Sequence, residues 1–382
     1  MERVEKKTGD FPFILSVTLL VGFGVAVLYS ASYAHAEQLG RDPQYFFTKQ
    51  ILWIGLGTVA AFIASTTPLD LFRRTIPLIL LLSFVLLLLT FVPQVGQPVL
   101  GARRWIFLFG QSFQPSELAK VALLLYLSTI FAKKEKRLDE PVNTLLPPLL
   151  VVSVFVGLIL VQNDFSTALF LFFLCLLLFF IARVRIVYLF LLGSIVVPLG
   201  IILLFSKEHR VARIVSFLDP GKDPAGSGFQ ILQARLSLLD GGFWGKGLGM
   251  GTGKMGVLPE AHSDFIFAVV GEELGFLGVL LVLCLFIFFA YRGYMIALQS
   301  RDSFHYYLAF GGTTLIFFQA VLNMAVVAGL VPATGIPLPF FSSGGSSLLM
   351  SMFVCGLVVN VSRHVERHVQ DHPMAPGGGL YV

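Results

Sequence analysis

The stretch IVYLFLLGSIVVPLGIILLFS, at residues 186–206, contains no charged residue. A helix needs about 20 mostly apolar residues to cross the hydrocarbon core of a bilayer, and this stretch is long enough. Comparable runs recur along the 382-residue chain, which is 56% hydrophobic and 13% charged. An ordinary soluble domain carries roughly 25% charged residues. The composition therefore predicts a membrane protein and excludes a water-soluble enzyme with one core.

Ten apolar runs of this kind can be delimited, at residues 11–33, 46–66, 74–93, 115–132, 145–161, 165–182, 186–206, 264–291, 305–330 and 341–362. They predict an all-α polytopic membrane protein with about ten transmembrane helices. The first run exceeds the roughly 7–15 apolar residues of a cleaved signal peptide, so we expect a retained anchor. Cys175, Cys284 and Cys355 lie inside the runs and predict neither disulfides nor a metal site.

Lysine and arginine residues predict the orientation of the helices. If the N-terminus is cytoplasmic, most of these residues fall in cytoplasmic loops, as the positive-inside rule requires. The chain then divides into a cytoplasmic N-terminus at 1–10, seven helices over 11–206, a long extracytoplasmic loop at 207–262, three helices over 263–362 and a cytoplasmic tail at 363–382. We therefore expect a protein of the cytoplasmic membrane with both termini inside.

Polar side chains gather on the expected outer side, and the first group surrounds the start of the fourth run. Arg103 and Arg104 stand beside Trp105, where they could hold a phosphate, although a tryptophan at this level is usually a membrane anchor. Glu117 and Lys120 are i, i+3 neighbours that can simply neutralise each other.

The long outer segment carries basic residues and many glycines. Arg210, Arg213 and Lys254 are free to bind an anionic ligand, because a long loop is translocated whatever its charge. The glycine-rich stretch 241–254 does not match a P-loop, because Leu248 stands where the first glycine should be. Its glycines suit tight turns and a close approach of the backbone to a ligand, with a flexible re-entrant loop as the alternative.

The most specific group of polar residues lies just before the eighth run and in its first part. Asp264 follows His262 at the expected N-terminus of a helix, where the helix dipole favours an ionised carboxylate, and a capping role is the alternative. Glu272 lies about 12 Å deeper at 1.5 Å per residue, too far to share one proton-transfer site with Asp264. Glu272 and Glu273 need a cation inside a membrane, which Lys120 or an arginine of the outer segment could supply.

Three further segments interrupt the apolar pattern. Gln319 and Asn323 are i, i+4 neighbours in the ninth run. The proline-, glycine- and serine-rich stretch 332–347, which includes Ser343, predicts non-helical backbone that lines protein or a water-filled cavity. The turn Gln-Asn-Asp at 162–164 is either a further polar site or, equally well, a simple connection that needs polar residues.

Several of these segments together carry a family resemblance. Gln114-Pro-Ser-Glu-Leu-Ala-Lys120, Pro259-Glu-Ala-His-Ser-Asp-Phe-Ile-Phe267, Gly271-Glu-Glu-Leu-Gly275 and Gly335-Ile-Pro-Leu-Pro339 with Ser343-Gly-Gly-Ser346 resemble motifs of the SEDS family, named for shape, elongation, division and sporulation. They stand in the family's order and spacing over about residues 11–365. Pro259-Glu-Ala-His262 resembles the division branch more than the elongation branch, and Ser263 stands where threonine is more usual.

The resemblance implies the ten-helix SEDS fold and an inverting peptidoglycan glycosyltransferase. Its substrate would be lipid II, a disaccharide-pentapeptide on undecaprenyl pyrophosphate, polymerised on the outer face of the membrane at the division septum. The implied partners are a class B penicillin-binding protein, which supplies the transpeptidase, and other divisome proteins; no nucleic acid is expected. The one cofactor that this chemistry could use is a divalent cation, Mg²⁺ or Mn²⁺.

The resemblance also implies roles for individual side chains. Asp264 would be the catalytic carboxylate, taking the proton from the acceptor 4-hydroxyl in a single displacement. The side chains expected to bind substrate are Arg103, Arg104, Trp105, Lys120, Arg210, Arg213, Lys254, His262 and Ser343. Those expected to form a structural polar network are Glu117, Glu272, Glu273, Gln319 and Asn323.

Two other functions fit parts of the sequence. A lipid II flippase or transporter would use a carboxylate such as Glu272 in a proton relay. The polar residues, however, gather on one side of the membrane, and no internal repeat is visible. A non-catalytic scaffold that recruits septal enzymes is the other alternative.

Overall fold

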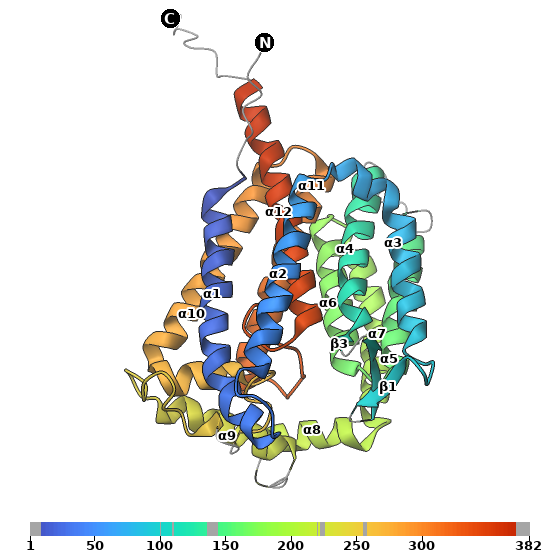
Figure 1. Cartoon of the computed structure of the whole chain (residues 1–382). Helices are drawn as coiled ribbons and strands as arrows, with labels where there is room; N and C mark the ends of the chain where they lie inside the picture. The colour runs from blue at the N-terminus through green and yellow to red at the C-terminus, as the bar shows by residue number, and fades with distance from the viewer. Residues whose placement is uncertain are drawn as a thin grey trace, which may run out of the picture.

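The computed structural model describes residues 9–99, 101–108, 111–135, 144–219, 221, 226–254 and 258–371. Its bundle consists of α1 (Phe11–Gln38), α2 (Tyr45–Thr66), α3 (Leu69–Leu89), α4 (Pro115–Lys134), α5 (Leu146–Val161), α6 (Phe165–Ile181), α7 (Ile186–Phe205), α10 (Ile266–Gln299), α11 (Ser303–Val327) and α12 (Gly345–Asp371) (Figure 1). Within the described residues, eight of these helices are long and apolar enough to cross a membrane, whereas α5 and α6 are apolar but shorter. Each predicted run corresponds to one helix, which confirms the all-α polytopic fold class.

Some helices extend beyond the apolar runs that predicted them. The run 264–291 continues as helix to Gln299, and the run 341–362 continues to Asp371. Hydropathy marks the part of a helix that lies in hydrocarbon, whereas the backbone stays helical where polar residues leave it. Of the predicted cytoplasmic ends, residues 1–8 and 372–382 lie outside the described part of the chain.

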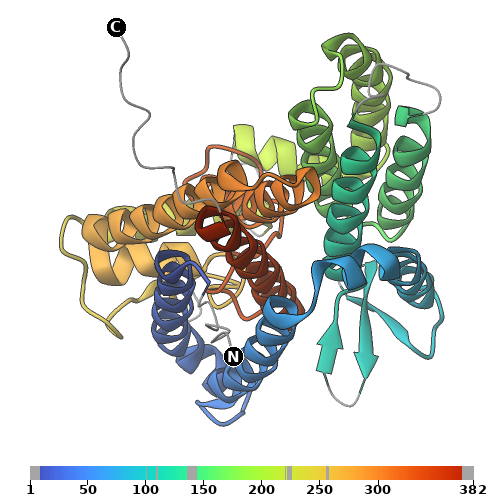
Figure 2. The same ribbon diagram turned by 90° about the horizontal axis from the view of Figure 1, so that it is seen from above.

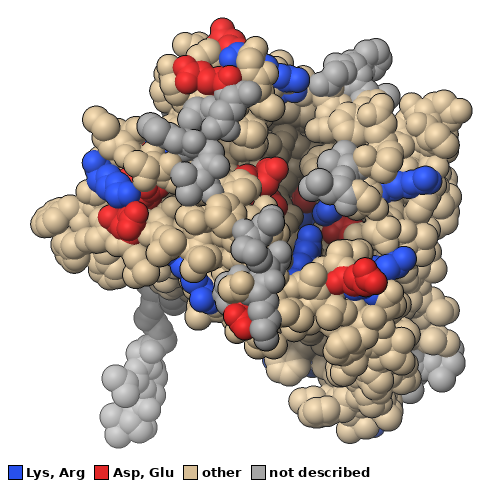
Figure 3. Space-filling view, turned by 90° about the horizontal axis from the view of Figure 1, so that it is seen from below, with Lys and Arg blue, Asp and Glu red and all other residues tan. Residues whose placement is uncertain are grey.

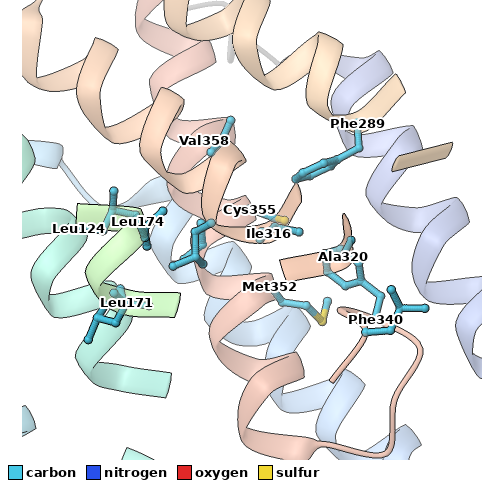
Figure 4. Close-up of a cluster of buried hydrophobic side chains, with 14 of the residues drawn as sticks. Leu124, Leu171, Leu174, Phe289, Ile316, Ala320, Phe340, Met352, Cys355 and Val358 are labelled. Carbon is cyan, nitrogen blue, oxygen red and sulfur yellow. The ribbon is translucent and has the colours of Figure 1, made fainter. Parts of the chain in front are cut away.

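Apolar side chains from several helices meet in one core. In the view along the bundle, α12 lies near the centre (Figure 2), and it packs along α2 and against α11. A Cβ on Gly356 of α12 would collide with the carbonyl oxygen of Ala61, so α2 and α12 approach backbone to backbone. Figure 4 shows Leu124, Ile316 and Val358 in this core, contributed by α4, α11 and α12.

One end of the bundle is covered by structure that the sequence analysis did not predict. A three-stranded antiparallel sheet is formed by β1 (Gly96–Val99), β2 (Ala102–Leu108) and β3 (Gln111–Phe113), in the order β1-β2-β3. Two further helices, α8 (Glu208–Leu218) and α9 (Ser227–Asp240), lie across the same end, opposite the termini (Figure 1). The segment 207–262, expected as a long loop, is therefore partly helical.

Candidate active site

Asp264 lies just before the first turn of α10; part of the residue's surface is exposed, whereas its carboxyl group is enclosed by protein. The N-cap residue of that helix is Phe265, and no side chain makes a capping hydrogen bond there. The hydroxyl of Ser263 instead donates to Glu260 Oε2 at 2.8 Å. The capping alternative for Ser263 and Asp264 is thus wrong, and the carboxyl group of Asp264 is not used to begin the helix.

The irregular segment between α11 and α12 holds the backbone around Asp264. Asn323 of α11 donates from Nδ2 to the carbonyl oxygens of Asp264 and Ile336, both at 2.9 Å. The backbone N–H of Ser343 donates to the carbonyl oxygen of His262 at 3.1 Å. Gly335 has a φ of +69°, and a Cβ built there would stand 3.4 Å from Asp264 Oδ2. The motifs at 259–267 and 335–346 therefore meet at this carboxylate.

A cavity of about 670 Å³ lies at the end of the bundle that α8 covers; its wall includes Thr334, the neighbour of Gly335, whereas Asp264 itself is not among the lining residues. Its charged wall residues are the bases Arg104, Lys207, Arg210 and Arg213 and the acid Asp164. Figure 3 views this end and shows a hollow with basic and acidic side chains in its walls. We call this cavity the basic pocket, because its cations outnumber its carboxylates.

The charges of the basic pocket act on Asp264. The pKa of the Asp264 carboxyl is raised to about 6, first by burial and then by the negative charge of Glu260. Arg104 and Arg213 oppose this rise, and Asp164 adds to it. A carboxylate with a pKa near neutrality is suited to proton transfer.

Each arginine of the pocket is held by a specific contact. Arg210 donates to the carbonyl oxygen of Leu203 at 2.7 Å and lies 5.0 Å from the ring centroid of Phe165. Arg213 donates to the carbonyl oxygen of Ala333 at 3.5 Å, and burial lowers the pKa of its guanidinium. The sequence prediction grouped these two arginines correctly, and α8 is the unpredicted element that brings them to the pocket.

Asp164 belongs to the turn at 162–164, which the sequence left open between a site and a simple connection, and it lines the basic pocket. Its side chain is 2% exposed, lies 3.6 Å from Arg104 and accepts from Gln114 Nε2 at 3.3 Å. It also caps α6 by accepting from the backbone N–H of Thr167 at 3.3 Å. An aspartate in a polar turn before a helix is explained by that cap as well as by a site, so the sequence alone could not decide between the two roles.

An apolar groove of about 880 Å³ continues from the basic pocket, sharing Phe173 and Phe318 with it. It runs between α6, α7 and α11. None of the residues of α7 is buried, and Phe190, on the wall of the groove, is 72% exposed. The groove therefore lies at the lipid-facing surface of the bundle.

Lys120 is buried away from the wall of the basic pocket. Its ammonium lies 2.8 Å from Glu117 Oε2 and donates to Gln319 Oε1 at 3.0 Å, so the pair neutralises itself as the spacing suggested. Gln319 in turn donates to the carbonyl oxygen of Pro337 at 3.0 Å. This cluster supports the segment that carries Gly335.

Other predicted binding residues are placed outside the pocket wall. His262 is 7% exposed and stacks on His35 with ring centroids 4.3 Å apart; burial lowers its pKa to about 4. Trp105 pairs with Gln97 across β1 and β2. Arg103, the neighbour of Arg104 on β2, is exposed. Of the three residues at 103–105, only Arg104 lines the pocket.

The two glutamates of α10 are neutralised by lysines of the glycine-rich stretch. Lys246 Nζ lies 2.9 Å from Glu272 Oε1, and Lys254 Nζ lies 2.6 Å from Glu273 Oε1. The expectation that Lys120 or an arginine supplies these cations was wrong, because the stretch 241–254 folds directly against α10. Lys254 is 6% exposed and does not line the basic pocket.

That stretch, which we call the strap, seals a break in α10. Gly275 has φ 65° and ψ −160°, which interrupts the helix and leaves backbone groups without helical partners. The strap supplies those partners. The bonds run from Phe276 N–H to Gly242 O (2.9 Å), Leu277 N–H to Phe243 O (3.4 Å), Lys246 N–H to Glu272 O (3.0 Å) and Gly247 N–H to Glu273 O (2.9 Å). The glycines thus serve a close approach to α10 instead of the expected ligand.

The described residues contain no group of three or more His, Cys, Asp or Glu side chains that could hold a metal ion. A divalent cation would therefore need oxygen ligands from a bound substrate in addition to those of the chain. Asp164 and Asp264 are the carboxylates that face Arg104 and Arg213 here.

The chain resembles known proteins over almost its whole length. A family model described as "Cell cycle protein" (FTSW_RODA_SPOVE) matches residues 11–367. A Geobacter sp. (strain M18) protein named "Probable peptidoglycan glycosyltransferase FtsW" is 40% identical, over 95% of this chain and 98% of its own. "Stage V sporulation protein E" of Bacillus subtilis (strain 168) is 37% identical, over 94% of this chain and 98% of its own.

Solved structures give the same result. A chain from a peptidoglycan synthase complex, described for its coordination of polymerization and crosslinking, has a TM-score of 0.76 and 31% identity, covering 94% of this chain and 98% of that one. The Rod shape determining protein RodA of Thermus thermophilus has a TM-score of 0.67 and 29% identity, covering 93% and 97%. The chain therefore belongs to the FtsW/RodA/SpoVE family of cell cycle proteins, the SEDS family that its motifs resemble.

Proposed function

We propose that the chain is a peptidoglycan glycosyltransferase that polymerises lipid II, with Asp264 as its general base. The observation that carries this proposal is the setting of Asp264, a carboxylate with a raised pKa beside a basic pocket that opens into an apolar groove. Lipid II combines a sugar that must be activated, a diphosphate and a polyprenyl chain. The site offers one environment for each.

The basic pocket suits the diphosphate. Arg104, Arg210 and Arg213 can present guanidinium groups, whose planar donors match phosphate oxygens. The apolar groove suits the first part of the polyprenyl chain, because it begins at Phe173 and Phe318 and lies on the lipid-facing side. A lipid-linked substrate could thus enter sideways from the bilayer.

The chemistry would be a single inverting displacement. Asp264 takes the proton of the acceptor 4-hydroxyl while that oxygen attacks the anomeric carbon of the donor sugar. The bond from this carbon to the diphosphate oxygen breaks, and its electron pair leaves with undecaprenyl diphosphate. General base catalysis contributes about 10²–10⁴-fold, and the arginines stabilise the charge that grows on the leaving diphosphate.

A retaining reaction is disfavoured by the surroundings of Glu272. By analogy with glycosidases, it would need a second carboxylate about 5 Å away as nucleophile. Glu272 is held by Lys246 and by the backbone N–H of Thr252, at 2.9 and 2.7 Å. Those partners belong to the strap and none of them contacts Asp264.

We further propose that a divalent cation, Mg²⁺ or Mn²⁺, binds with the substrate. Mg²⁺ in such sites is typically held by one or two carboxylates together with phosphate oxygens, and Asp164, in the wall of the basic pocket, is the carboxylate that can serve while Asp264 acts as the base. Such an ion would offset the charge of the diphosphate. Chelation with EDTA is expected to reduce polymerisation, and an unchanged rate would contradict this part of the proposal.

We propose that α8, α9 and the sheet lie on the outer face of the cytoplasmic membrane. Both ends of the described chain lie at the opposite end of the bundle (Figure 1), which fits an even number of crossings and cytoplasmic termini. The positive-inside bias of the loops supports this orientation. Lipid II presented at the outer surface would then meet the basic pocket directly.

We propose a class B penicillin-binding protein as partner, which would crosslink the strands that this chain makes. The support is the similar chain found in a complex that coordinates polymerization and crosslinking. We also propose other divisome proteins as partners, supported by the match to a family model described as "Cell cycle protein".

The flippase alternative finds less support. A proton relay needs carboxylates that can change charge, whereas Glu272 and Glu273 each lie in an ion pair with a lysine. A non-catalytic scaffold would not explain why the pKa of Asp264 is raised.

The experiment that tests the proposed function follows labelled lipid II in vesicles that contain the purified chain, with and without a cognate transpeptidase. We expect glycan strands to form. Movement of lipid II across the vesicle membrane without strand formation would favour the flippase, and neither outcome would favour the scaffold.

A further inference from the structure

The strap carries an apolar tip that the proposed reaction does not use. Phe243, Trp244, Leu248 and Met250 are 54%, 77%, 60% and 70% exposed. Large apolar side chains that gather on a surface usually mark a contact with a partner or a membrane. The tip is therefore a candidate interaction surface.

The exposure of the tip is not a sign of a loose segment. The strap is bonded to both sides of the break in α10, and the backbone N–H of Gly249 also donates to Glu273 Oε2 at 3.1 Å. Lys254 ties it to α1 as well, because its ammonium donates to Ser30 Oγ at 2.8 Å. A rigid base thus holds four apolar side chains outwards.

The tip is continuous with the lipid-facing surface of a transmembrane helix. The ring of Phe243 stacks on Phe276 of α10, with centroids 5.8 Å apart and an interplanar angle of 24°. Phe276, Leu280 and Leu281, on this part of α10, are 53%, 43% and 49% exposed. Because α10 is apolar and long enough to span a membrane, these side chains face lipid.

The tip presents little charge. Lys246 is the one charged residue between 241 and 253, and its ammonium is bonded to Glu272 and Asp240 at 2.9 and 3.2 Å. A polar partner surface would find few hydrogen-bonding groups here. Lipid is the better match, because aromatic residues are favoured at the level of the headgroups.

We propose that the strap tip is an interfacial foot that inserts Phe243, Trp244, Leu248 and Met250 between the lipid headgroups and the acyl chains. The partner is the phospholipid surface itself, on the side of the membrane where α8 and α9 lie. Insertion buries apolar area in the boundary region, as for other membrane-surface segments. The foot fixes the height of the strap, and through it the position of α9 and of the two glutamates that the strap neutralises.

The depth of Trp244 in a bilayer tests this proposal. The full chain is placed at one copy per nanodisc of phosphatidylethanolamine and phosphatidylglycerol, with bromine near the headgroup end or near the far end of the acyl chains. The chain has three tryptophans, so the signal of Trp244 is the difference between the wild type and Trp244→Phe. This variant keeps an apolar ring and leaves Trp53 and Trp105 as internal references.

We expect bromine near the headgroups to cause the larger loss of Trp244 emission and aqueous iodide to cause little. Quenching by iodide without quenching by brominated lipid would place the tip in water and overturn the proposal. Protection from both quenchers would mean that protein covers the tip, which overturns it equally. Neither result depends on lipid II polymerisation, so the proposed function stands or falls separately.

Discussion

Asp264 owes its raised pKa to its neighbours, and this makes its role testable by pH. Burial and Glu260 favour the neutral acid, whereas Arg104 and Arg213 favour the carboxylate. A general base must be ionised before it can take a proton, so only the molecules with an ionised Asp264 are active. At neutral pH that fraction is large, and in acid it vanishes.

The first prediction is a rate that falls in acid. Below pH about 6 the rate of lipid II polymerisation should drop about tenfold per pH unit, because the ionised fraction of Asp264 falls by that factor. Initial rates between pH 5 and 8 under otherwise constant conditions would measure the profile. A flat profile across pH 6 would mean that the titrating base is another group.

Asp164 offers a second residue-scale prediction. Its charge raises the pKa of Asp264, and its removal should shift the acid limb of the rate profile to lower pH. Asp164→Asn is the suitable change, because asparagine can still cap α6. Asp70→Asn, at an exposed carboxylate on α3 that pairs with Arg73, is the matched control and should leave the limb in place. A shift to higher pH would contradict the electrostatic account.

The site residues show what the sequence could and could not predict. Asp264 stood out because it lies beside His262 in a stretch that resembles a family motif, although a helix cap could also have explained it. In the sequence, Lys254 and Arg210 are both basic residues of the outer segment. Only the structure shows that Lys254 neutralises Glu273 whereas Arg210 lines the basic pocket. Asp164 was left undecided, because a polar turn or a helix cap explained it as well as a site did.

At the scale of elements, the strap depends on glycines that let two backbones touch. Gly245 has a φ of +81°, and a Cβ there would collide with the carbonyl oxygen of Glu273. Gly249 has a similar φ of +85°, but a Cβ there would meet nothing within 4 Å. The two positions therefore separate the cost of the dihedral angle from the cost of the collision.

We predict that Gly245→Ala destabilises the protein more than Gly249→Ala. The cost should be about 1–2 kcal/mol at Gly249, from the left-handed backbone alone. It should reach about 3 kcal/mol or more at Gly245, where the strap must also move away from α10. Thermal unfolding midpoints in the same detergent would measure the difference. Equal midpoints would show that the strap is not packed as described.

The helices were predictable as elements, whereas the sheet, α8 and α9 were not. Long apolar runs are a strong signal, because only a helix satisfies its backbone inside a membrane. The strands of the sheet have only 3 to 7 residues, too few for a periodic pattern to stand out. α8 and α9 lie in a segment without a long apolar run, and a division of the chain by hydropathy alone therefore predicts a loop there.

At the scale of the whole molecule, the basic pocket and the apolar groove form one path from lipid to the charged residues that act on Asp264. Gly193 of α7 lines the groove, and Gly200 lies on the same helix outside it. A Cβ at either position would meet nothing within 4 Å. Gly193→Phe and Gly200→Phe are therefore a matched pair that adds the same side chain inside and outside the groove.

We predict that Gly193→Phe raises the KM for lipid II by about tenfold, equivalent to roughly 1.4 kcal/mol of lost contact with the polyprenyl chain. Gly200→Phe should leave the KM close to that of the wild type. Steady-state kinetics with lipid II in detergent would compare them. An equal effect of both changes, or none, would mean that the chain of the substrate lies elsewhere.

The most direct test of the account is the polymerisation rate of Asp264→Asn at neutral pH, beside its thermal unfolding midpoint. Because the pKa of Asp264 is raised from 3.8 to about 6 on folding, stability is lost as the pH rises between these values, and at neutral pH the loss is complete; the neutral amide should therefore leave the midpoint unchanged or raise it. The rate should fall by about 10²–10⁴-fold, the contribution of a general base. A folded Asp264→Asn protein that polymerises lipid II at the rate of the wild type would contradict the central claim.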